Sequence, residues 1–214
     1  MIIEETFGSD TISPEELQLL SETMTGFIEL GPEEDLYRYI GECLCRFAPG
    51  SFAVVNAFDE ANRAMVTKAF AGVEPYFGIV QRLFGRLPLG VSHTLSERSH
   101  DLMVKNHIVR FPRFDEVAMT GIDPTIRQQL TDFLADRQVY IMMFRYRGKI
   151  FADALWLIET SVRLPNRHLV EAFYQGASVA LSRRRAEEAL QESEEHFRAL
   201  FEHSCDLQYV LDLE

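Results

Sequence analysis

The side chains that could catalyse a reaction or hold a metal ion are few in this sequence and widely spaced. Cys43 and Cys45 stand two residues apart in a helical pattern, so they point to different sides of that helix. They therefore cannot share a metal ion or a disulfide bond. Cys205 lies far down the chain. We expect all three to be reduced, structural thiols.

Catalytic and phosphate-binding motifs are also missing from the sequence. It contains no H-E-x-x-H, C-x-x-C or G-x-S-x-G motif. The stretch "FAGVEPYFG", residues 70–78, lacks the glycine spacing of a phosphate-binding loop. We expect no catalytic site and no metal site in these residues.

The composition excludes further classes of function. The chain has 214 residues, 47% of them hydrophobic, and a net charge of −12. This charge disfavours binding to nucleic acid or to an anionic membrane surface, both of which need a basic face. The N-terminus does not resemble a signal peptide, and no apolar run approaches the ~18 residues of a membrane span. We expect a cytoplasmic protein.

Helix signals dominate the first fifty residues. Ser13 can cap a helix, Pro14 suits its first position and Glu16 completes a capping box. Apolar residues at helical spacing predict that this helix continues to about residue 30. A second amphipathic helix is predicted within residues 33–50, where a Pro-Gly pair ends it.

The rest of the chain alternates strand and helix patterns. Two hairpins are predicted, "SFAVVNAF" with "AMVTKAFAG" around "DEANR", and "QVYIMMFRY" with "IFADALWLIE" around "RGK". The second pair is apolar on both faces, as in strands covered on two sides. Asp123 can cap a helix in "DPTIRQQLTDFLAD". Between residues 73 and 106 we expect a short helix, then a loop with a small strand.

A long helix is predicted from residue 166 to 201. At 1.5 Å per residue it would measure ~50 Å and must project from a small domain. Its apolar and charged residues follow the 4-3 spacing of a parallel coiled coil. Charged residues at seam positions in the middle of this helix predict that two copies of the helix associate only weakly there. The predicted seam consists of Leu169, Phe173, Gly176, Ala180, Arg183, Glu187, Leu190, Glu194, Phe197 and Phe201.

This order of elements resembles a GAF domain, over roughly residues 15–181. The cues are "DLYRYIGECLCRF" before the first strand and "VYIMMFRYRGKIFADALWLIE" before the long helix. The resemblance implies an α+β fold, a three-layer sandwich. Its mainly antiparallel central sheet would carry helices on both faces, with a long projecting C-terminal helix. Asp153 stands where family members often have Gly.

The end of the chain resembles the opening of a PAS domain. "EEHFRALFEHS" looks like its first helix and "LQYVLDL" like its first strand, after a signalling helix. One strand cannot bury its faces alone, so we expect a fragment of a longer protein. The expected divisions are an N-terminal helix (1–31), a GAF-like core (32–165), an exit helix (166–193) and a PAS start (194–214).

The resemblance implies a ligand pocket between the sheet and the variable segment at about 73–137. A mostly apolar wall with a few polar side chains suits a small ligand. The alternatives are that the aromatic residues are simply core, and that Arg145 pairs with Asp153. The candidate ligand-binding residues are Asn56, Phe58, Phe77, His93, Phe111, Met143, Arg145 and Trp156.

The identity of a ligand or cofactor stays open. Covalent attachment of a bilin would need a cysteine beside a pocket histidine, and none stands near His93 or His100. Haem needs one axial histidine, so His93, His100 and His107 leave haem open. "NAFDE", residues 56–60, lacks the dispersed signature of cyclic-nucleotide-binding GAF domains. It is better interpreted as a strand end with a polar turn.

Two functions are compatible with these features. The first is a sensory input module, most typically of a histidine kinase, that binds a small molecule and relays the change through the C-terminal helix. A diguanylate cyclase or phosphodiesterase parent is the runner-up. The second is a ligand-free dimerisation scaffold. Both predict a homodimer through the N-terminal and C-terminal helices.

Overall fold

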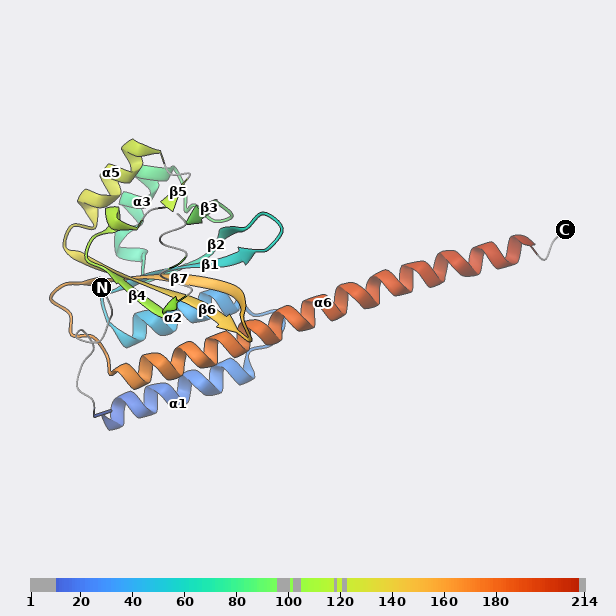
Figure 1. Ribbon diagram of the computed structural model, residues 1–214, viewed down its shortest axis with the longest axis horizontal. Coiled ribbons are helices and arrows are strands. Elements are labelled where there is room, and N and C mark those ends of the chain that lie inside the picture. Colours follow the sequence, from blue (N-terminus) through green and yellow to red (C-terminus); the bar gives the residue numbers. More distant parts are fainter. Residues whose placement is uncertain (1–10, 96–100, 102–104, 118, 121–122, 212–214) are drawn as a thin grey trace.

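A seven-stranded antiparallel sheet runs through the middle of the molecule, in the order β4-β6-β7-β1-β2-β3-β5 (Figure 1). The computed structural model describes residues 11–95, 101, 105–117, 119–120 and 123–211. The strands are β1 (Phe52–Asp59), β2 (Ala64–Ala71), β3 (Ser92–Leu95), β4 (Ile108–Phe111), β5 (Met119–Thr120), β6 (Arg137–Tyr146) and β7 (Lys149–Glu159). The short β4 and β5 carry too few residues to produce a strand pattern, and the sequence did not predict them.

Helices cover both faces of this sheet, which confirms the predicted three-layer α+β fold. The long helices lie on one face and the short ones on the other (Figure 1). The first group is α1 (Pro14–Glu29), α2 (Leu36–Phe47) and the first half of α6 (Arg167–Leu211). The second group is α3 (Phe77–Phe84), α5 (Pro124–Phe133) and the 3-10 turns η2 (Glu74–Tyr76) and η3 (Phe114–Glu116).

The central strands divide their side chains between two apolar cores. On β7, Trp156 packs toward the long helices, whereas Leu155 and Leu157 pack toward the short ones. On β6, Met142 and Met143 divide in the same way. Successive side chains of a strand point to opposite faces, so strands buried on both sides must be apolar throughout.

The predicted start of α1 is confirmed and has a second role. The Ser13 hydroxyl accepts from the Glu16 backbone N–H, and the Glu16 carboxylate accepts from the Ser13 N–H, at 3.2 and 2.9 Å. The other Glu16 oxygen accepts from the backbone N–H of Asn166 at 2.9 Å. One carboxylate therefore joins the beginning of α1 to the residue that precedes α6.

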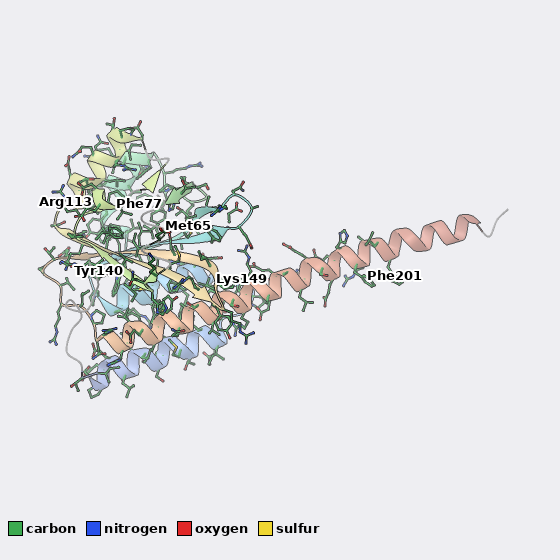
Figure 2. The ribbon with its side chains drawn as sticks, viewed as in Figure 1. Met65, Phe77, Arg113, Tyr140, Lys149 and Phe201 are labelled. Atoms are coloured by element: carbon green, nitrogen blue, oxygen red, sulfur yellow. The ribbon has the colours of Figure 1, made fainter. Side chains whose placement is uncertain are left out.

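Helix α6 packs with its first half and projects with its second (Figure 1). Leu169, Phe173 and Ala180 are buried in the chain's own core, against the sheet and α1. The prediction that they form an intermolecular seam is therefore wrong. Figure 2 shows Phe201 far from the domain, on the projecting part.

The strand predicted from "LQYVLDL", residues 207–213, is wrong as far as the structure describes it. The backbone is helical to Leu211, and residues 212–214 lie outside the described part. A helix pairs its backbone groups within itself, whereas a lone strand has no neighbour with which to pair.

Close packing of α2 on the sheet makes a specific prediction at Gly41. A Cβ there would lie 2.9 Å from the Ala71 Cβ and 3.4 Å from Val55 Cγ2, two short side chains that cannot swing aside. Overpacking costs about 1–3 kcal/mol. We expect Gly41→Ala to lower the free energy of unfolding in urea, although Ala favours helices by about 1 kcal/mol.

Gly78→Ala in α3 is the matched control, because a Cβ there meets nothing within 4 Å. We expect this substitution to leave the free energy of unfolding unchanged or to raise it by up to about 1 kcal/mol. Equal gains from the two substitutions would contradict the packing described for α2.

Candidate ligand site

A cavity of about 150 Å³ lies between the sheet and the layer of short helices. Its wall is mainly apolar, with a few polar side chains, and the exposed residues Val91 and Ser92 place one edge at the surface. The lining residues are Phe52, Val54, Asn56, Thr67, Phe70, Val73, Tyr76, Val80, Phe84, Pro88, Val91, Ser92, His93, Phe114, Leu130, Phe133, Leu134, Leu155 and Leu157.

The strand register brings the polar residues of the wall to one end. Asn56 on β1 lies opposite Asp153 on β7 and opposite Thr67 on β2. An irregularity in the β1–β2 pairing falls between Val55 and Asn56. It shifts the register beside the cavity, so Asn56 and Thr67 both line it.

Asn56 and Asp153 form a fully buried pair that is only half satisfied. The Asn56 Nδ2 donates to Asp153 Oδ1 at 2.6 Å. Asn56 Oδ1 and Asp153 Oδ2 have no partner, and both residues are 0% exposed. Burial raises the pKa of the Asp153 carboxyl to about 7, and the hydrogen bond from Asn56 offsets only part of this effect.

His93 adds a third unpaired polar atom to this end of the cavity. It lies on β3 opposite Met65, is 7% exposed, and its Nε2 has no partner. Burial lowers the pKa of His93 to about 4, so the ring is neutral near pH 7. A neutral imidazole can accept a hydrogen bond at one nitrogen and donate at the other.

Arg137, which the sequence did not single out, lies behind two residues of the cavity wall, Phe52 and Tyr76. Its Nη2 donates to the Tyr76 hydroxyl at 2.6 Å and to Glu159 Oε1 at 2.8 Å. The guanidinium also lies over the rings of Tyr76 and Phe52, at 4.8 and 5.2 Å. This buried cation is fully engaged by its neighbours, and the only hint in the sequence was an arginine opening an apolar strand.

The structure brings two of the eight predicted site residues, Asn56 and His93, into the cavity wall. Phe111 and Met143 belong to the same apolar core but do not line the cavity. Phe58 is partly buried and packs against that core. These placements do not test whether any of the residues binds a ligand, which stays a prediction.

The other three predicted residues lie away from the cavity. Trp156 faces the opposite core and donates from Nε1 to Ser51 Oγ at 3.0 Å. Phe77 is 48% exposed, in the upper layer of Figure 2. Arg145 forms no ion pair with Asp153, because it lies opposite Ile150 beyond an irregularity in β6–β7.

The residues that sequence reasoning missed are mainly apolar strand residues. Val54 lines the cavity with Asn56 because the two are two residues apart on β1, and Leu155 and Leu157 follow from Asp153 on β7 in the same way. Residues two apart on a strand share a face, so such residues can be identified from the sequence once a polar residue shows which face holds the cavity.

The placement of the histidines leaves the haem prediction untested. His93 lies in the cavity, whereas His107 stacks on Tyr174 of α6, with ring centroids 4.5 Å apart, on the other side of the sheet. His100 lies outside the described residues. Within the described part of the chain, no cluster of His, Cys, Asp and Glu could hold a metal ion.

The hairpin turn after β1 agrees with the interpretation of "NAFDE" as a strand end. The Asp59 carboxylate accepts from the Asn62 backbone N–H at 3.2 Å and from its Nδ2 at 2.7 Å. Among the helices that the structure describes, none has both the length and the apolar character to cross a membrane.

Solved structures with this arrangement include GAF domains and phytochrome photosensory modules. A GAF domain of an Acinetobacter phosphoenolpyruvate-protein phosphotransferase matches 82% of this chain and 97% of its own, with 13% identity and a TM-score of 0.54. The corresponding domain from Coxiella burnetii matches 81% of this chain and 96% of its own, with 12% identity and a TM-score of 0.56. The chain has the GAF fold.

The Stigmatella aurantiaca phytochrome photosensory core module has the same GAF-type arrangement within a larger chain. It matches 90% of this chain and 41% of its own, with 13% identity and a TM-score of 0.59. No family model and no curated protein matches the sequence. At these identities the likeness to GAF domains shows the fold alone.

The opposite pKa shifts of Asp153 and His93 predict opposite pH effects on stability. Between about pH 4 and 7, folded Asp153 keeps a proton that the unfolded chain releases, so raising the pH favours unfolding. Between about pH 6.5 and 4, His93 is protonated in the unfolded chain and neutral in the folded chain, so lowering the pH favours unfolding.

Thermal unfolding midpoints from pH 4 to 8 separate the two effects. We expect Asp153→Asn to gain stability over the native chain as the pH rises from about 4 to 7, with a constant difference above. We expect His93→Gln to gain stability over the native chain as the pH falls from about 6.5 to 4. Difference curves without slope in these ranges would contradict the described environments.

Proposed function

We propose that this chain is the sensory input domain of a signalling protein and binds a small molecule in the cavity. The observation that carries the proposal is the cavity whose wall includes Asn56 of the half-satisfied Asn56–Asp153 pair. Natural cores are close-packed and pair their buried polar groups, so a cavity with unpaired polar atoms in its described wall suits a small ligand. The GAF fold supports this function by analogy.

A direct connection runs from the cavity to α6. Asn56 lies on β1, and two residues further along the same strand the Phe58 carbonyl accepts from Arg185 Nη1 at 3.2 Å. A ligand that shifts Asn56 would shift the strand that holds Arg185. We propose that this contact passes the change to the exit helix.

Two neighbouring arginines attach α6 to the end of α1. Arg183 donates to the carbonyls of Phe27 and Leu30, at 3.2 and 3.5 Å. Arg184 donates to three carbonyls of the following loop, at 2.6 to 3.0 Å, those of Gly31, Pro32 and Glu34. Cations near a helix C-terminus are favourable. These contacts hold α6 at the place where it leaves the domain, so a change in the domain must move the helix.

We propose that the projecting part of α6 pairs with the same part of a second copy. Residues 185–201 are exposed throughout, and Leu190, Phe197 and Leu200 are 57–64% exposed. An isolated helix is only marginally stable in water, and a parallel partner would cover this apolar stripe. A relay through α6 then acts on a dimer.

The parent protein is proposed to be a histidine kinase, with a diguanylate cyclase or phosphodiesterase as the alternative output. The PAS-like sequence of residues 194–214, whose described part forms the end of α6, supports a further sensor module in the parent protein. The other candidate function is a ligand-free scaffold, favoured by the same exposed stripe on α6. The two functions differ in whether the cavity is occupied.

Native mass spectrometry of the purified chain tests the proposed function. We expect a species whose mass exceeds that of the denatured chain by one small molecule per copy. Denaturation should release that molecule, because unfolding removes the cavity that holds it. If the native chain is a dimer with no added mass, and a panel of small apolar molecules leaves its unfolding temperature unchanged, the scaffold function is correct.

The proposed pairing of α6 predicts the effect of Leu190→Glu with Phe197→Glu. We expect the double variant to be monomeric in sedimentation equilibrium where the native chain is dimeric, since two charges replace the apolar stripe. Each copy should still fold, because both side chains are more than 60% exposed in the single chain, but its unfolding temperature should no longer rise with protein concentration.

Gln191→Glu with His196→Glu is the matched control. It places the same two carboxylates at exposed positions of the same helix without removing an apolar side chain. We expect this variant to remain dimeric. A dimeric Leu190→Glu/Phe197→Glu variant would show that the copies meet elsewhere.

A further inference from the structure

We infer that the cavity takes a ring-sized, mainly apolar molecule that carries a hydrogen-bond donor, such as an alcohol or a primary amine, and no negative charge. This inference deepens the proposed function and rests on it, because it names the chemical class of the ligand in the same cavity. Three observations carry it: the volume of the cavity, the unpaired polar atoms of Asn56 and His93 in its wall, and the lack of a lysine or arginine among the described residues that line it.

The volume limits the size of the ligand. The cavity of about 150 Å³ is smaller than the roughly 300–1,000 Å³ pockets that hold drug-sized ligands. An apolar core cavity of about this size in another protein binds one benzene molecule. A single aromatic or aliphatic ring therefore fills this space, against Phe70, Phe84 and Leu155 among other apolar side chains.

The unpaired atoms at the polar end need a donor. Asn56 already uses its Nδ2 as the donor to Asp153, and its free Oδ1 can only accept. Asp153 does not itself line the cavity, but it holds the Asn56 amide by accepting the hydrogen bond from Nδ2. His93 is neutral, and its unpaired Nε2 can accept as well. A hydroxyl or amino group placed among these atoms pairs acceptors that are otherwise buried without partners, which is favourable.

A carboxylate or phosphate would meet no lysine or arginine among the described residues of this wall. Arg137 lies behind Phe52 and Tyr76 without lining the cavity, and Glu159 and the Tyr76 hydroxyl engage its guanidinium. Arg145 has an unpaired Nε, yet it does not line the cavity. Beside Asn56 an anion would meet the unpaired Oδ1, with the Asp153 carboxyl directly behind the amide. Burying a charge without a partner is strongly unfavourable.

Three probes that share one benzene ring test the parts of this inference separately: toluene, benzyl alcohol and benzoate. Each is titrated into the whole native chain at pH 8 by calorimetry, and the unfolding temperature is followed in parallel. We expect benzyl alcohol to bind about tenfold more tightly than toluene. We expect no binding of benzoate at concentrations that saturate the chain with benzyl alcohol.

The double variant Asn56→Leu/Asp153→Leu tests the role of the polar pair. Replacing both partners by apolar side chains of similar shape is close to neutral for stability. We expect toluene to bind still, and benzyl alcohol to lose its advantage to within about twofold. If this variant does not fold, Asp153→Asn preserves the shape and removes the charge, and benzoate binding should then become measurable.

The outcomes distinguish this inference from the proposed function. If toluene and benzyl alcohol bind the native chain equally, or if benzoate binds as tightly as benzyl alcohol, the cavity is a ligand site but the donor requirement is wrong. If the Asn56→Leu/Asp153→Leu variant keeps the native preference, the polar pair does not set it. If none of the three probes binds, both the inference and the proposed ligand site fail.

Discussion

Each central strand contributes side chains to two apolar cores, one on each face of the sheet, and the rest of the structure depends on this arrangement. Strands β1, β6 and β7 have no face toward water, so every side chain on them must either pack or find a polar partner inside the protein. Most of their residues are apolar and pack. Asn56 and Asp153 are polar instead. The register places them opposite each other, and one oxygen of each has no hydrogen-bond partner.

The two cores are filled differently, and this difference creates the cavity. On one side the long helices interlock through large rings, with Phe173 of α6 in contact with Phe27, Phe47 and Phe144 at centroid distances of 5.1 to 6.2 Å. On the other side the cover consists of helices of eight and ten residues with short strands between them. These elements do not close over the sheet completely. The space remains where the polar pair lies.

Strand β1 gives the molecule its connection between the cavity and the exit helix. Its middle carries Asn56, and its end holds Arg185 through the Phe58 carbonyl. Sequence reasoning placed Arg183, the first of the three arginines at 183–185, at a charged position of a weak coiled-coil seam. Instead, two of them hold carbonyl groups around the end of α1, and the third holds β1. The carbonyls that they bind are more than 120 residues away in the chain, so no local pattern could indicate them.

The sequence by itself determined the elements whose signals are local. The capping box at Ser13, the Asp123 cap, both hairpins and the long C-terminal helix all follow from residues a few positions apart. Only the tertiary structure decided which face each strand residue serves, because the pairing skips Lys68 on β2 and Phe151 on β7 and so interrupts the alternation of faces along these two strands. It brought Asn56 and His93 to the cavity, sent Trp156 to the other core, and kept "LQYVL" helical because an unpaired strand cannot satisfy its backbone.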